Sequence, residues 1–177
     1  MSNKHFFLAV SLSAAMFFFA LYSCIKPAGD HRYILGLSFQ DSYGNDLVNG
    51  IELIYEHSDG YFGEVKPDLY DLRITFPKTN IFGEWHTLFT NWNNNGFLMY
   101  DVILYDNSPQ IMTINLKCPY IFNNEGIHVI NTYWESVNET DDVCYKIEYN
   151  GKVIDEIKYG EANSFKSSFA VIVLDDL

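Results

Sequence analysis

From Tyr33 onward, apolar and aromatic residues alternate with polar ones in short runs, and Gly, Asn, Asp and Pro separate these runs. A period of two places successive side chains on opposite faces of a β-strand. Many short strands with turn residues between them are typical of an all-β fold, so we expect an antiparallel β-sandwich, immunoglobulin-like or similar. The predicted strands are residues 33–40, 51–56, 69–76, 97–105, 110–117, 128–134, 143–149, 152–159 and 167–174.

Three segments give sharper local expectations. Asn150 and Gly151 stand between two alternating runs, which predicts a type I′ hairpin because both central residues of that turn need a positive φ. The C-terminal run "SFAVIVLDD" is apolar on both faces, which predicts a central strand covered on both sides. Residues 91–95, "NWNNN", predict a loop.

The N-terminal segment has the layout of an export signal. Lys4 precedes an apolar run that ends at "LYSC", residues 21–24. This tetrapeptide is similar to the bacterial lipobox, with Leu three positions before the cysteine and a small residue directly before it, although Tyr22 departs from the usual pattern. We therefore expect cleavage before Cys24 and lipidation of its thiol with diacylglycerol and further acyl chains such as palmitate, which together anchor a protein stably. The alternatives are an uncleaved signal anchor and an ordinary signal with an incidental cysteine.

This interpretation divides the chain and places it in the cell. We expect residues 1–23 to be a lipoprotein signal peptide, 24–32 a tether, and 33–177 a single β-sandwich domain. A formal net charge of −12 argues against a nucleic-acid partner and against electrostatic docking on anionic lipids. The lipid would then provide the membrane attachment, and we expect an outer-membrane location facing the periplasm or the cell exterior.

Four segments of the expected mature chain are similar to a group of known sequences. "GLSFQDSYGNDLVNGI", "VKPDLYDLRITFP", "INLKCPYIF" and "CYKIEYNGK" together resemble a group of uncharacterised short lipoproteins of Bacteroides-type gut bacteria. The resemblance covers most of the mature chain and implies a lipoprotein. It implies no activity and no functional residues.

An Asn-rich segment offers a candidate binding surface. Trp85 and Trp92 lie in or beside "GEWHTLFTNWNNNGF", which also contains Asn93 and Asn94. Exposed Trp faces stack on sugars, and Asn side chains donate and accept hydrogen bonds to hydroxyls, so these residues are candidates for glycan binding. Trp134 is a weaker third member. The competing interpretation is that the tryptophans pin the loop to the domain.

Cys118 and Cys144 remain after Cys24, and an exported compartment permits a disulfide between them. Strand alternation predicts that Cys118 faces the core with Leu116, whereas Cys144 faces outward with Lys146. A disulfide and two free thiols are equally compatible with this pattern.

The sequence contains no recognisable catalytic or metal-binding motif. The turn "DSYGND" offers the oxygens of Asp41, Asn45 and Asp46 but lacks the further ligands of a calcium loop. The histidines lack metal-ligand spacing, and the acidic residues are too numerous to select a catalytic pair. We expect a non-catalytic, membrane-anchored lipoprotein of the cell envelope, without metal or cofactor, that binds glycan or another envelope component. The alternatives are a structural or assembly partner in an envelope complex, joined through an exposed strand edge, and a hydrolase.

Overall fold

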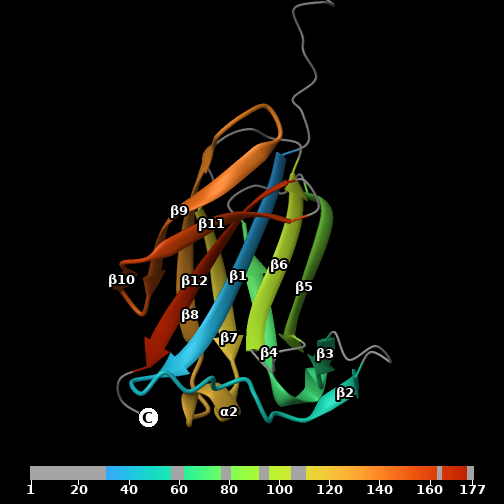
Figure 1. The fold of residues 1–177 in the computed structure, drawn as a ribbon, viewed down its shortest axis with the longest axis vertical. Coiled ribbons are helices and arrows are strands. Elements are labelled where there is room, and N and C mark those ends of the chain that lie inside the picture. The colour runs from blue at the N-terminus through green and yellow to red at the C-terminus, as the bar shows by residue number, and fades with distance from the viewer. Residues whose placement is uncertain are drawn as a thin grey trace, which may run out of the picture.

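The computed structural model describes residues 31–56, 62–76, 81–91, 96–104, 111–162 and 165–174, which form one 12-stranded sheet (Figure 1). The strands are β1 (His31–Asp41), β2 (Leu53–Glu56), β3 (Phe62–Val65), β4 (Asp71–Thr75), β5 (Ile81–Asn91), β6 (Gly96–Leu104), β7 (Ile111–Lys117), β8 (His128–Ser136), β9 (Asp141–Tyr149), β10 (Lys152–Ile154), β11 (Ile157–Ala162) and β12 (Phe165–Leu174). A 3-10 turn, η1 (Pro67–Leu69), and a short helix, α2 (Pro119–Phe122), connect strands. No helix in these ranges combines the length and the hydropathy needed to cross a bilayer.

The all-β prediction is confirmed, but the sheet is mixed rather than wholly antiparallel. Its main path runs β2-β3-β5-β6-β1-β9-β8-β7-β4, and β10, β11 and β12 lie off this path. β1 runs parallel with both β9 and β12, whereas the other described pairs are antiparallel. Both parallel pairs join β1 to strands more than a hundred positions later in the sequence.

The sheet forks at β1. One edge of β1 pairs with β6 over residues 31–37. The opposite edge pairs first with β9 at residues 32–33 and then with β12 over residues 35–41. β9 leads on to β8, β7 and β4, whereas β12 leads only to β11. Two branches of the sheet therefore diverge from the same edge of one strand.

Buried polar contacts hold the apex of this fork. His31 Nδ1 lies 2.7 Å from Asp142 Oδ2, and Ser136 donates a hydrogen bond of 2.7 Å to the other oxygen of that carboxyl group. Burial raises the pKa of Asp142. The backbone N–H of Cys144 on β9 donates to Ser168 Oγ on β12 at 2.9 Å, which ties the two branches together. The branches separate only beyond this point.

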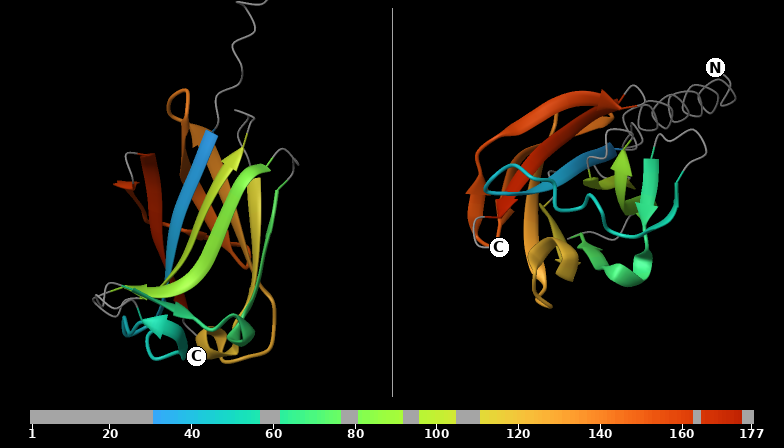
Figure 2. Two further views of the ribbon diagram at one scale, coloured as in Figure 1. Left: turned by 90° about the vertical axis from the view of Figure 1, so that its right-hand side faces the viewer. Right: turned by 60° about the horizontal axis from the view of Figure 1, so that its bottom comes forward.

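The sheet curls around one hydrophobic core, as Figure 2 shows from the side and from below. Tyr100 on β6 and Thr132 on β8 lie on opposite sides of this core, and their hydroxyl oxygens are 3.1 Å apart. The Trp134 ring packs edge-on against Tyr33, with 5.2 Å between ring centroids. Trp134 on β8 thus packs against Tyr33 on β1, and these two strands are not neighbours in the sheet.

Most predicted strands are confirmed, with three differences. Residues 152–159 form two strands, β10 and β11, because the chain leaves β9 for β12 between them. β3 and β5 were not predicted; a register shift near Gly83 breaks the alternation of β5. In β12, Val171 and Val173 are 37% and 46% exposed, so the prediction that both faces are covered is wrong at these residues.

The hairpin after β9 has the predicted geometry. Asn150 and Gly151 have φ values of 47° and 81°, and Tyr149 pairs directly with Lys152. These are the positive φ angles of a type I′ turn, so this prediction is confirmed. The turn directs β10 back along the edge of β9 that faces β12.

A bulge in β9 reverses the predicted orientation of Cys144. Tyr133 of β8 pairs with Lys146, but Trp134 pairs with Cys144, so Tyr145 is an extra residue in β9. An extra residue shifts the alternation of side chains by one position. Cys144 is consequently buried and Tyr145 is exposed, and the expectation that Cys144 faces outward is wrong.

Candidate functional site

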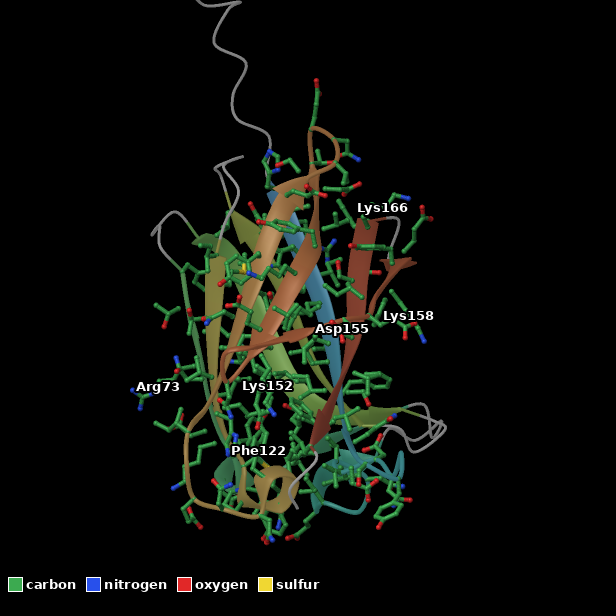
Figure 3. All side chains as sticks on the ribbon, turned by 90° about the vertical axis from the view of Figure 1, so that its left-hand side faces the viewer. Arg73, Phe122, Lys152, Asp155, Lys158 and Lys166 are labelled. Atoms are coloured by element: carbon green, nitrogen blue, oxygen red, sulfur yellow. The ribbon has the colours of Figure 1, made fainter. Side chains whose placement is uncertain are left out.

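A cavity of about 840 Å³ lies where the two branches of the sheet diverge. Its two long walls are β10, attached to β9, and the second half of β12, and we call it the interstrand gap. Figure 3 shows the chain crossing from β10 to β11 beside Asp155, with Lys152 below this crossing and Phe122 at the lower end. The fork of the sheet therefore creates a site that no single element contains.

The lining residues show how the walls are oriented. On β12, the gap contacts residues 169–171, 173 and 174, and on β10 it contacts residues 152–154. A cavity lying over one face of a strand contacts every second residue, because side chains alternate between faces. Contact with consecutive residues on both walls indicates that the gap lies between two strand edges, and its lining extends beyond β12 to Ser38 on β1 and Phe97 on β6.

Three stacked rings form the lower end of the gap. The rings of Phe122 and His128 are nearly parallel, with centroids 3.6 Å apart, and Tyr149 lies parallel to His128 at 5.9 Å. The short helix α2 begins at Pro119 and ends at Phe122, and the left-handed φ of 52° at the next residue, Asn123, turns the chain toward β8. We call Phe122, His128 and Tyr149 the ring stack.

Both ring nitrogens of His128 are engaged. Nδ1 lies 2.6 Å from Tyr149 Oη, and Nε2 lies 3.1 Å from Asn124 Oδ1. Burial lowers the pKa of His128 and raises the pKa of Tyr149, which favours a neutral imidazole and a protonated phenol. Because Asn124 Oδ1 can only accept, Nε2–H donates to it and the Tyr149 hydroxyl donates to Nδ1. The ring stack is therefore a fixed platform with its polar atoms satisfied.

The rim of the gap carries both signs of charge. Lys158 and Glu156 form an ion pair of 3.4 Å. Lys152 and Asp155 also line the gap, and within the described ranges neither takes part in an ion pair. One positive and one negative side chain are thus available to a ligand.

The structure does not bring the predicted binding residues to this gap. Trp85 lies within β5, not in a loop. Trp92, Asn93 and Asn94 lie outside the described residues, as does Cys24. Trp134 is fully buried and donates its indole N–H to Thr132 at 2.9 Å, so its assignment as a third exposed aromatic is wrong. The gap was missed because its two walls, β10 and β12, face each other only through the fork at β1.

In the turn at residues 41–46, which was considered as a calcium site, the carboxylates accept hydrogen bonds from the backbone. Asp41 accepts hydrogen bonds from the backbone N–H groups of Tyr43 and Asn45, each 2.9 Å long. Asp46 accepts from Val48 at 2.8 Å and from Gly96, on β6, at 2.6 Å. Hydrogen bonds from Asn45 lower the pKa of Asp41. These oxygens stabilise the turn, and the described part of the chain holds no cluster of potential metal ligands.

The two cysteines are free and buried, so of the two alternatives the structure has free thiols. Cys118 follows the end of β7 near His128, whereas Cys144 pairs with Trp134. His128 and Trp134 are six positions apart on β8, which corresponds to roughly 20 Å at about 3.3 Å per residue. A disulfide requires Cα atoms within about 7 Å, so strand register prevents the bridge.

These thiols are expected to be inert in the folded protein. Burial raises the pKa of Cys144 to about 12 and also raises the pKa of Cys118. At pH 8 this lowers the reactive thiolate of Cys144 about a thousandfold. In the Cys24→Ala chain, we expect a disulfide reagent to titrate both thiols in urea and to react at least about a hundredfold more slowly without it. Rapid native reaction of one thiol would contradict the buried positions.

Comparison with protein-family models, with curated proteins and with solved structures finds no match to this chain.

Proposed function

We propose that the protein is a non-catalytic, lipid-anchored protein of the cell envelope that binds another envelope component in the interstrand gap. The observation that carries the binding function is the gap itself, a cavity of about 840 Å³ between two strand edges. Ligand sites are typically concave, largely apolar and furnished with a few polar groups. The ring stack and the uncommitted charges of Lys152 and Asp155 fit that description.

The chemistry of the gap favours binding over catalysis. A general base needs a free lone pair within reach of the substrate proton. Nδ1 of His128 accepts from Tyr149, and Nε2 donates to Asn124, so this imidazole has no nitrogen free for that role. Its position in a stack with Phe122 suits contact with a ligand surface instead.

The proposed lipid anchor is attached to the thiol of Cys24. β1 begins at His31, seven residues after Cys24, which would keep this end of the domain close to the membrane. β1 then extends for 11 residues, or about 35 Å, to Asp41, which pairs with Leu174 beside the gap. The gap would then face away from the bilayer, where an envelope partner can reach it.

We also propose that the curled sheet works as a β-sandwich scaffold. Tyr100 and Thr132 interact across one core from strands on opposite sides, as the inner faces of a sandwich do. Such a scaffold would hold the two edges of the gap at a constant separation.

Metabolic labelling tests the anchor. Radiolabelled palmitate is expected to enter the wild type and the Cys144→Ala variant but not the Cys24→Ala variant. Equal labelling of Cys24→Ala, or no labelling of the wild type, would contradict lipidation at Cys24.

Array binding tests the gap. The protein would be applied to envelope glycans and to synthetic decapeptides, together with a Val171→Lys/Val173→Lys variant. Both valines are exposed on β12, so these changes place charge at the gap without disturbing the core. Val137→Lys is the matched control, because Val137 is 50% exposed in the loop between β8 and β9. We expect the wild type and Val137→Lys to bind the same probe and the double variant to lose it; no binding by the wild type would overturn the proposed function.

The tryptophan segment remains a separate glycan-binding prediction. A Trp92→Ala variant on the same glycan array tests it, because stacking on a sugar requires the indole ring. Loss of glycan signal in this variant, with peptide binding unchanged, would place sugar recognition outside the gap.

A further inference from the structure

We infer that the interstrand gap receives an extended polypeptide segment of a partner protein, which adds a strand to the sheet along β12. The inference rests on the proposed function of the gap as a binding site and names the class of its ligand. It follows from three features of the gap: an interrupted strand position, two facing edges, and a pair of opposite uncommitted charges.

The strand position beside β12 is only half occupied. β11 pairs with β12 over residues 165–170, ending where Ile157 pairs with Ala170. Beyond this point, residues 171–174 pair with β1 on one side and, among the described residues, with no strand on the other. Four residues of edge extend about 14 Å, enough to pair with a short strand. An incoming segment would continue the line that β11 begins.

The opposite wall is a second strand edge. β10 pairs with β9 through residues 152–154, and its other side faces the gap. Backbone N–H and C=O groups on such edges have hydrogen-bonding capacity that a peptide main chain satisfies repeatedly. A lipid chain has no donors or acceptors, and the hydroxyl groups of a sugar do not have the regular N–H and C=O spacing of a β-ladder. The lining by consecutive residues on both walls therefore favours a peptide.

The two ends of the gap differ. Asp155 and Glu156 join β10 to β11 and close one end, whereas at the other end no connection among the described residues joins the hairpin at Gly151 to Leu174 of β12. A segment running antiparallel to β12, as β11 does, would enter at the open end and point toward the closed end. This direction follows from continuing the antiparallel pairing of β11 with β12.

The surroundings define the sequence that fits. Ile154 and Leu174 pack with the core on one side of the gap, whereas Val171 and Val173 are exposed on the other side. A bound strand should therefore alternate between apolar residues directed inward and polar residues directed outward. An acidic side chain near its N-terminal end would meet Lys152, by the open-end hairpin, and a basic one farther along would meet Asp155.

Charge argues for a different protein rather than a second copy as the donor of this strand. The chain carries a formal net charge of −12, so two copies repel one another. The gap itself has balanced charges, with two lysines and two acids on its rim. A partner of different overall charge meets no such repulsion.

Hydrogen exchange with a defined probe tests the inference. The probe is a synthetic decapeptide of alternating apolar and polar residues, with Glu in its first half and Lys in its second. We expect its binding to slow amide exchange at least about tenfold within residues 152–154 and 171–174 while leaving the far loop at Val137 unchanged. The matched probe has the same side chains with alternate backbone amides N-methylated. Loss of one main-chain donor after another should weaken its binding at least about tenfold.

Each outcome separates the inference from the proposed function. Protection of both edges, together with loss of affinity on N-methylation and in Val171→Lys/Val173→Lys, supports strand addition. Binding of glycans alone by the gap overturns the inference and leaves the binding function intact, whereas binding of neither class overturns both. Peptide binding with protection elsewhere, or a dimer whose interface protects these same edges without any peptide, also overturns it. Circular dichroism of each variant confirms that the fold is retained.

Discussion

Replacing Trp134 with alanine is expected to lower the free energy of unfolding by about 3–5 kcal/mol, the usual range for removing a large aromatic from a core. Trp134 is completely buried and packs against Tyr33 and Tyr100, with ring centroids 5.2 and 5.9 Å away. These rings come from three different strands, so no single neighbour can fill the cavity. The loss should appear in urea denaturation followed by far-ultraviolet circular dichroism.

Two comparisons show whether packing causes this effect. Trp134→Phe keeps much of the ring volume but loses the indole N–H, and it should cost less than the alanine change. Tyr145→Ala removes an exposed aromatic from the bulge of β9 and should change stability by less than about 1 kcal/mol. A similarly small effect for Trp134→Ala would contradict the position of this side chain at the centre of the core.

Replacing Thr132 with valine is the second large effect, because one hydroxyl serves three partners. It accepts from the Trp134 indole N–H at 2.9 Å and lies 3.1 Å from the Tyr100 hydroxyl. It donates to the Met112 carbonyl at 3.3 Å. Valine has the same shape without the hydroxyl. It leaves the buried Trp134 indole N–H unpaired, at about 1–3 kcal/mol, and leaves the Tyr100 hydroxyl with the weaker acceptor Met112 Sδ, 3.6 Å away. Burial raises the pKa of Tyr100 well above its ordinary value, so its hydroxyl cannot escape this loss by ionising.

The control for this change is Thr132→Ser. Serine keeps the hydroxyl and removes one methyl group, worth about 0.8 kcal/mol. We therefore predict that Thr132→Val lowers the free energy of unfolding more than Thr132→Ser does, as measured by denaturant titration. Equal effects would mean that the hydroxyl contributes nothing. The double variant Thr132→Val/Trp134→Phe should lose less than the sum, since both changes remove the same hydrogen bond.

The alternation of apolar and polar residues predicts side-chain orientation correctly where one face of a strand is buried and the hydrogen-bond ladder is regular. β7 shows this, because Met112, Ile114 and Leu116 are buried at every second position. The pattern failed where the ladder is irregular. The extra residue at Tyr145 turns Cys144 into the core, and alternation cannot reveal a bulge whose inserted residue is itself aromatic.

The candidate site depends on distant segments. Asn150 and Gly151 predicted the hairpin that starts β10, and that turn needs only its own residues. Lys152 on β10 and Val173 on β12 line one cavity because β9, which carries β10, and β12 both attach to one edge of β1. Nothing in the spacing of these residues along the chain indicates that meeting.

The amino-acid sequence by itself determined the strand-forming character of the chain, most strand positions and the hairpin after β9, because these depend on side-chain alternation and turn residues within a few positions of one another. Only the tertiary structure decided which strands share an edge, where the sheet forks, and that an unfilled strand position opens beside β12. Strand pairing is a competition among all available edges, and packing of the whole core settles it. Parallel attachment of β9 and β12 to β1 joins residues more than a hundred positions apart, beyond the reach of any local pattern.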